Sequence, residues 1–168
     1  MPPAGTALSG RFWRIVAEHR LDHVLDGATS AEGRFHRDGQ RAIYLSPSPR
    51  DAAFAIAPYL RPGDPPRLSV PLFLERARLA DLRDGDTCAA LGLRGDETAI
   101  PWLPERAKGL PATTWRASDA ARATDHDGII YAARSAPERW HLVLFRWNMP
   151  GAPELRRDGA PLPFVPAP

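Results

Sequence analysis

Short apolar runs, separated by loops rich in proline and glycine, dominate the pattern of this chain. Aromatic and β-branched runs of this length are typical of strands. They predict strands over 11–16, 42–45, 68–74, 129–131 and 140–145. The last run is the most apolar, so we expect it inside a sheet. Pro71 has no N–H, which predicts an edge or a bulge for part of the third run.

Helix signals are fewer and irregularly spaced between these strands. Ser48 before Pro49 is a helix start, and the apolar run that follows predicts a helix over 52–57. Further helices are expected over 86–91 and over 118–123, the latter capped by Ser118, with a helix or turn over 19–25. Because strands and helices do not alternate, we predict an α+β domain with a mixed or antiparallel sheet.

Length and composition suit one soluble domain. The chain has 168 residues, of which 43% are hydrophobic and 25% charged, enough for a single substantial core. Its 19 prolines are densest near the ends, so we expect flexible tails at 1–10 and 150–168 around a domain over 11–149. The single cysteine and the lack of a secretory signal at the start favour the cytoplasm.

Several partner and enzyme classes are disfavoured. No apolar run approaches the ~20 residues that span a bilayer, which argues against a membrane partner. The net charge is only +2 and no basic run stands out, which argues against direct nucleic-acid binding. The chain has no phosphate loop, dinucleotide glycine motif or nucleophile elbow. His19 and His23 have helical spacing, but Arg20 stands where a metalloprotease needs glutamate, so we expect no metal site.

The most informative segment runs from a glycine-bounded loop into the second strand. Arg34 lies in the loop and Tyr44 follows ten residues later on the strand. A guanidinium matches phosphate oxygens through its planar fork, and a phenol can stack on a flat ring and hydrogen-bond at its tip. Together they suit a nucleotide-like ligand. The alternative is a surface arginine and a core tyrosine.

Blocks at 13–15, 33–35, 43–46, 127–131 and 142–145 give the chain its resemblance to a known family. In order and spacing they resemble RES-domain proteins over roughly residues 11 to 147. This family takes its name from an arginine, a glutamate and a serine. The resemblance implies a fold related to ADP-ribosyltransferases, and a toxin of a bacterial toxin–antitoxin pair.

Such toxins destroy NAD⁺ by phosphorolysis or hydrolysis, or transfer its ADP-ribose to a target. The resemblance therefore implies NAD⁺ as substrate, no tightly bound cofactor, and an antitoxin partner with a helix-turn-helix domain. The family arginine falls on Arg34, which would hold the pyrophosphate or the nicotinamide ribose, and the tyrosine falls on Tyr44, which would position the nicotinamide. Further residues expected to line the cleft are Arg14, Ser46, Tyr131 and Arg134.

Two family positions depart from the pattern. The glutamate falls on Ala55 and the serine on Ala133. A carboxylate would stabilise the positive charge that builds on the ribose C1′ during cleavage, and alanine cannot supply it. Three explanations stay open: the acid comes from Glu75 or Asp51, the chain binds a nucleotide without consuming it, or Ala55 is a deliberate substitution in a toxic protein.

Two other function classes also stay open. One is a non-catalytic module that presents the same surface to a partner protein, which an NAD⁺-depletion assay would separate from the enzyme. The other, weaker, is a nucleic-acid binder that uses Arg34, Arg37 and Arg41, whose affinity would fall steeply with salt. The acceptor of the ADP-ribose is open between phosphate, water and a macromolecule.

Overall fold

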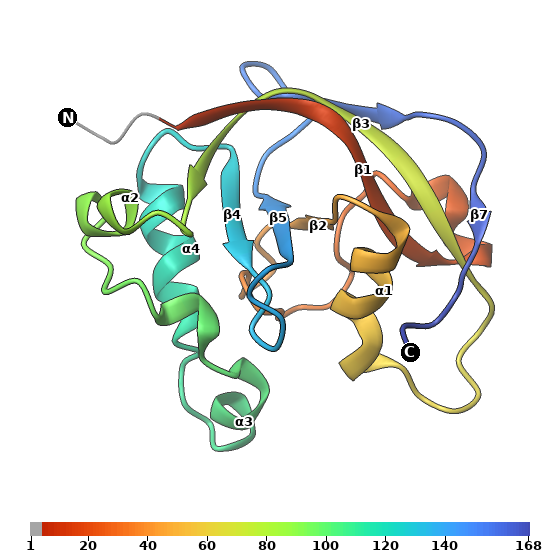
Figure 1. Ribbon diagram of the computed structural model, residues 1–168, viewed down its shortest axis with the longest axis horizontal. Coiled ribbons are helices and arrows are strands. Elements are labelled where there is room, and N and C mark those ends of the chain that lie inside the picture. The colour runs from red at the N-terminus through yellow and green to blue at the C-terminus, as the bar shows by residue number, and fades with distance from the viewer. Residues whose placement is uncertain (1–4) are drawn as a thin grey trace.

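The computed structural model describes residues 5–168, and a curved sheet of seven strands lies at its centre (Figure 1). The strands are β1 (Thr6–Ala17), β2 (Ile43–Leu45), β3 (Arg67–Asp81), β4 (Gly128–Ala132), β5 (Trp140–Leu144), β6 (Glu154–Arg157) and β7 (Leu162–Pro163). Their order is β1-β3-β4-β5-β2, and β6 and β7 pair with β3. Since β3 and β4 run parallel and the other pairs antiparallel, the mixed sheet confirms the predicted class.

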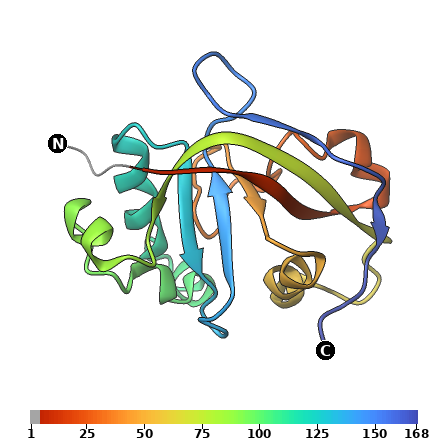
Figure 2. The ribbon, with the colours of Figure 1, turned by 45° about the horizontal axis from the view of Figure 1, so that its top comes forward.

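The two ends of this strand order lie side by side. Trp13 on β1 and Ser46, just after β2, exchange backbone hydrogen bonds of 2.7 and 3.0 Å. The sheet therefore curls toward a ring with an inner and an outer face. In Figure 2, β1 and β3 arch across β4 and β5. The position of β5 between β4 and β2 confirms that this apolar run lies inside the sheet.

Strand alternation divides the sheet between two hydrophobic clusters. Successive side chains of a strand point to opposite faces. The inner cluster takes one set of residues from β2, β4 and β5, namely Ile43, Leu45, Ile130, Leu142 and Leu144. The outer cluster takes the alternate set, Ile129, Tyr131 and Val143, with Tyr44 packed against it.

Four short α-helices and three 3₁₀ turns flank the sheet within residues 5–168. They are η1 (Glu18–His23), α1 (Pro49–Ile56), η2 (Ala57–Tyr59), α2 (Gly85–Ala90), η3 (Glu97–Ala99), α3 (Trp102–Ala107) and α4 (Thr114–Ala123). In Figure 1, α2, α3 and α4 lie on one side of the β4–β5 pair and α1 on the other. None of the helices in this part of the chain is long and apolar enough to cross a membrane.

Helix starts were predicted with mixed success. Ser48 caps α1 as expected, because its hydroxyl accepts the N–H of Asp51 at 3.0 Å. The predicted start of α4 is wrong. That helix begins at Thr114, and Ser118 lies inside it, buried, with its hydroxyl donating to the carbonyl of Trp115. A serine that bonds back into its own helix is a tolerated interior residue, which sequence alone does not separate from a cap.

Pro71 does not mark an edge or a bulge, so that prediction is wrong. It lies within β3, between β1 and the β6–β7 segment, opposite Trp13. Trp13 turns its own N–H and C=O toward Ser46, while the carbonyl of Pro71 accepts the N–H of Asp158 at 3.0 Å. The nitrogen of Pro71, which has no hydrogen to donate, therefore faces the segment between β6 and β7, where the pairing with β3 is interrupted.

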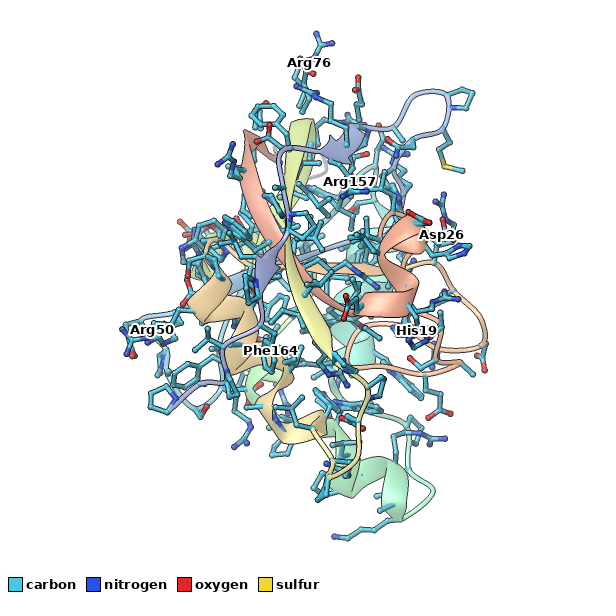
Figure 3. All side chains as sticks on the ribbon, turned by 90° about the vertical axis from the view of Figure 1, so that its right-hand side faces the viewer. His19, Asp26, Arg50, Arg76, Arg157 and Phe164 are labelled. Carbon is cyan, nitrogen blue, oxygen red and sulfur yellow. The ribbon has the colours of Figure 1, made fainter. Side chains whose placement is uncertain are left out.

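The terminal segments also differ from the predicted tails. The sheet begins at Thr6, inside the segment expected to be flexible, while residues 1–4 lie outside the described part. At the other end β6 and β7 pair with β3, and Leu155 is buried in the inner cluster. Figure 3 shows Phe164 on this last segment, which runs toward α1 and its Arg50. The strand β6 was not predicted because its sequence is polar except for one buried leucine, Leu155.

The edge of β6 that faces away from β3 is covered at Leu155 by the side chain of Asn148. Asn148 has a φ of 52°, in the left-handed region. Its amide donates to the carbonyl of Leu155 and accepts the N–H of the same residue, both at 2.8 Å. The backbone groups of Leu155 are thereby satisfied without a further strand.

Candidate functional site

Three neighbouring strands place a row of polar side chains on the outer face of the sheet. Tyr131 on β4 lies opposite His141 on β5, with ring centroids 5.7 Å apart. Ser46 follows β2 on the other side of His141, and its hydroxyl lies 2.8 Å from Nδ1 of that imidazole. All three residues are buried, so the row is a prearranged polar strip on an otherwise apolar face.

Arg34 lies above this row. Its guanidinium carbon is 5.1 Å from the ring centroid of Tyr131 and 5.3 Å from that of Phe35, and Nη2 donates to the carbonyl of Thr98 in η3. A cation over two aromatic faces is attracted by their quadrupoles. Burial raises the pKa of Tyr131 to about 12 although the charge of Arg34 opposes the shift, so this phenol stays protonated.

The loop that carries Arg34 is fastened to α4. The carbonyls of residues 33 to 35 all accept hydrogen bonds from side chains of that helix. The donors are Trp115 Nε1 at 2.9 Å, Thr114 Oγ1, and Arg122 Nη2 at 3.2 Å. Because these contacts fix the backbone on both sides of Arg34, its guanidinium is presented from a rigid support.

Tyr44 holds the same loop from below. Its hydroxyl accepts the N–H of Phe35 at 3.0 Å and lies 2.8 Å from Nδ1 of His36. Nε2 of His36 lies 3.0 Å from the carbonyl of Ser30. A carbonyl can only accept, so Nε2 carries the proton and the Tyr44 hydroxyl donates to Nδ1. Both directions of the hydroxyl are occupied, so Tyr44 supports the loop that carries Arg34.

A carboxylate approaches the row from α1. Asp51 accepts the hydroxyl of Ser48 at 2.7 Å and Nη1 of Arg139 at 2.5 Å, and its charge raises the proton affinity of His141. Ala55 follows one turn later on the same side of the helix and is half-buried. The guanidinium of Arg139 also lies 4.3 Å from the ring centroid of Phe54. This side of α1 therefore carries one acid, already paired with an arginine.

The other acid considered, Glu75, lies elsewhere. It forms an ion pair with Arg156 on β6 and lines a surface hollow of about 410 Å³ with residues 151–154. Figure 3 shows the neighbouring Arg76 at the top of the molecule, away from Arg50 on α1. Of the two acids, Asp51 is the one that the fold brings to the polar row.

A hydrogen bond joins the two flanks of the β4–β5 pair. Trp102 on α3 donates its indole N–H to the hydroxyl of Tyr59 in η2 at 2.9 Å. Tyr59 is 43% exposed and lies close enough to Tyr131 to influence its proton affinity. This contact places an aromatic pair beside the polar row, between the helices seen on opposite sides in Figure 1.

A comparison of the sequence with protein-family models shows which family the chain belongs to. The RES domain model matches residues 11–166. The chain belongs to the RES-domain family. The match extends through β6 and β7, beyond the end expected at residue 149. No curated protein matches the sequence.

A solved structure shares this RES fold. A chain of the crystal structure of the M. tuberculosis MbcT–MbcA toxin–antitoxin complex aligns with a TM-score of 0.61. The two chains are 18% identical, and the alignment covers 95% of this chain and 87% of that one. At this identity the likeness supports the architecture, and residue roles must come from the geometry.

The structure gathers some of the predicted RES site residues and not others. Arg34, Ser46 and Tyr131 lie together, and Tyr44 lies on the same face one row away. Arg14 lies on the same face of β1 as Phe12 and Val16 of the inner cluster and donates to the carbonyl of Gly27 at 3.1 Å. Burial lowers its pKa to about 10. Arg134 is exposed in the β4–β5 turn. The fold therefore does not add these two arginines to the row.

The structure also places Ala133, Arg37 and Arg41, which the sequence analysis considered. Ala133 follows β4, and its N–H bonds to the carbonyl of Arg139. Arg37 pairs with Asp119 on α4, whereas the guanidinium of Arg41 lies 3.9 Å from the ring centroid of Trp147. These two arginines thus have separate intramolecular partners. Among residues 5–168, no group of three or more His, Cys, Asp or Glu side chains could hold a metal ion.

Sequence reasoning missed His141, Arg139 and the donors on α4. His141 lies within the apolar run that predicted a strand, so the sequence did not reveal that its side chain lies between Ser46 and Tyr131. The pairing of β5 with β2 and β4 would have revealed it, because that register sets His141 between Ser46 and Tyr131.

The buried imidazoles predict a loss of stability in acid. Burial lowers the pKa of His141 from 6.5 to about 4 and also lowers that of His36. The unfolded chain therefore binds protons that the folded chain does not. Stability from neutral His141 is complete above pH 6.5 and is lost as the pH falls toward 4. We expect this residue to cost about 2 kcal/mol between pH 7 and pH 5.

Urea unfolding at the two pH values would measure this loss. The His141→Asn variant should lose correspondingly less stability between pH 7 and pH 5, since asparagine does not titrate there. Equal losses in the variant and the parent protein would contradict the assignment.

Proposed function

We propose that this RES-domain protein binds NAD⁺ on the outer face of the sheet and cleaves the bond between nicotinamide and ribose. The observation that carries the proposal is the placement of the Arg34 cation above the Tyr131–His141–Ser46 row, beside the carboxylate of Asp51. A rigid guanidinium suits the pyrophosphate of NAD⁺. The neighbouring rings of Tyr59 and Trp102 suit the flat nicotinamide.

The chemistry follows from charge. When the glycosidic bond breaks, positive charge builds on the ribose C1′ and nicotinamide leaves as a neutral base. Fixed negative charge in a water-poor site stabilises that transition state more than the ground state. Asp51 supplies such a charge, although its pairing with Arg139 weakens the effect. We therefore expect slow turnover by this chain.

The biological setting proposed is that of a toxin paired with an antitoxin. Membership of the RES family supports it, and the shared architecture with a chain of the MbcT–MbcA toxin–antitoxin complex is consistent with it. The partner would be an antitoxin with a helix-turn-helix domain. Expression of the chain should then lower cellular NAD⁺, and co-expression of the antitoxin should restore it. An unchanged NAD⁺ level would count against the toxin proposal.

A second candidate, a nucleotide-binding module without turnover, is favoured by Ala55 and Ala133. Neither methyl group can stabilise charge or move a proton. The two candidates share NAD⁺ binding and differ in its consumption. Calorimetric binding without depletion of NAD⁺ over hours would select the binding module.

Removal of the guanidinium should weaken NAD⁺ binding in both cases. We expect Arg34→Ala to raise the Kd by about 10- to 100-fold, because a charge-assisted hydrogen bond contributes about 1.5–3 kcal/mol. Titration calorimetry would measure the change. Arg157→Ala, on the exposed strand β6, is the matched control and should bind as the parent does. An unchanged Kd for Arg34→Ala would remove this residue from the site.

A further inference from the structure

His141 is a buried imidazole with one ring nitrogen left for a ligand. It is 3% exposed, and Nδ1 is engaged by the hydroxyl of Ser46 at 2.8 Å. No other described residue bonds to Nε2. The fully buried nitrogens without a partner in residues 5–168 are Nε of Arg14, Arg67 and Arg122. Since Nε2 of His141 is not among them, it keeps contact with solvent.

The charged groups around this imidazole come from three directions. Asp51 approaches from α1, Arg34 from its loop, and Arg139 from the β4–β5 turn, while the ring of Tyr131 lies on β4. Burial and the two arginines lower the pKa of His141, and Asp51 partly opposes them, with a result of about 4. The ring is therefore neutral at physiological pH. When Nδ1–H donates to Ser46, Nε2 presents a free lone pair beside the charge of Arg34.

We propose that His141 is the catalytic base of this site and that water is the acceptor of the ADP-ribose. The inference rests on the NAD⁺ cleavage proposed above. As the bond from C1′ to the nicotinamide nitrogen breaks, its electron pair leaves with nicotinamide. The water oxygen bonds to C1′, and one of its protons passes to Nε2 of His141. The products are ADP-ribose and nicotinamide, and the proton then goes to solvent.

A weak base is sufficient for this step. Water that bonds to a cationic C1′ becomes a strong acid, so even a strongly desolvated imidazole can accept its proton. The phosphate dianion needs no such help, because it attacks without losing a proton. The basic residues near the row are already engaged, Arg139 by the carboxylate of Asp51 and Arg34, in the proposed complex, by the pyrophosphate of NAD⁺. The site therefore suits hydrolysis better than phosphorolysis.

The variant His141→Asn separates these roles. Its amide can occupy the place of Nδ1 and keep the contact with Ser46, while Nε2 is lost. We expect the kcat of phosphate-free NAD⁺ hydrolysis to fall by about 10²–10⁴-fold, the usual contribution of a general base, with KM little changed. Any turnover that depends on added inorganic phosphate should be unaffected. Chromatography of the products distinguishes ADP-ribose from its phosphorylated form.

The measurement is made in the parent chain and in the Ala55→Glu background, with a thermal unfolding check at pH 7. His19→Asn, an exposed histidine on η1, is the control and should leave kcat unchanged. Equal hydrolysis by the parent and His141→Asn overturns the role of His141 and leaves the proposed function intact. A parent whose turnover requires phosphate overturns the assignment of water. Absence of turnover in both backgrounds overturns the proposed function, and this inference with it.

Discussion

Ala55→Glu is expected to raise NAD⁺ turnover by about 10²–10³-fold, the effect of one well-placed electrostatic group on a transition state. Position 55 follows Asp51 by one turn on the same side of α1. The carboxylate of Asp51 is shared with Arg139 and Ser48, whereas a glutamate at 55 would bring a second, unpaired charge. Alanine and glutamate are both good helix formers, so α1 should tolerate the change. Initial rates of NAD⁺ loss would measure it.

The matched control is Ala89→Glu, which places the same charge on the exposed side of α2. It should leave turnover at the level of the parent. Adding Arg34→Ala to the Ala55→Glu variant should return turnover toward that level, because the dinucleotide would no longer be held. Equal turnover by Ala55→Glu and the parent would contradict a catalytic role for position 55.

Gly33→Ala is expected to destabilise the protein by about 1–3 kcal/mol, the usual cost of overpacking, and to weaken NAD⁺ binding. A Cβ at this position would lie 2.2 Å from Cε1 and 2.5 Å from Nδ1 of His36, and 3.0 Å from the hydroxyl of Tyr44. His36 cannot move aside without breaking its bonds to Tyr44 and Ser30. The loop would have to shift, and Arg34 with it. Urea unfolding and calorimetry measure the two effects.

Gly85→Ala provides the control for this substitution. Gly85 is the first residue of α2, and a Cβ there meets nothing within 4 Å. Alanine favours a helix over glycine by about 0.8–1.0 kcal/mol in helix interiors, so this variant should be as stable as the parent or slightly more. If Gly33→Ala behaved in the same way, the tight packing of the Arg34 loop would be disproved.

Local signals predicted the elements whose causes are local. The apolar run of β5 and the Ser48–Pro49 start of α1 were both recognised, because strand burial and helix capping act over a few residues. The length of β3 was not, since Pro71 is tolerated only through the way Trp13 turns its backbone toward Ser46. That arrangement depends on how the sheet curls, and the sequence of residues 68–74 gives no sign of it.

The site divides in the same way. Arg34 and Tyr44 could be paired from the sequence because one short loop joins them. Their roles could not be separated, since the bonds from Tyr44 to Phe35 and His36 depend on how the loop folds back. The link from Ser46 to His141 spans 95 positions and required the pairing of β2 with β5. The fold also turns Arg14 to the inner face, which spacing did not foretell.

The amide of Asn148 has a consequence for the behaviour of the protein in concentrated solution. A sheet margin with unpaired N–H and C=O groups is a template for association and fibril growth. At Leu155 both groups are already held by a side chain of the same molecule. A strand from a second molecule would have to displace that amide before it could add there, so strand addition at Leu155 is disfavoured.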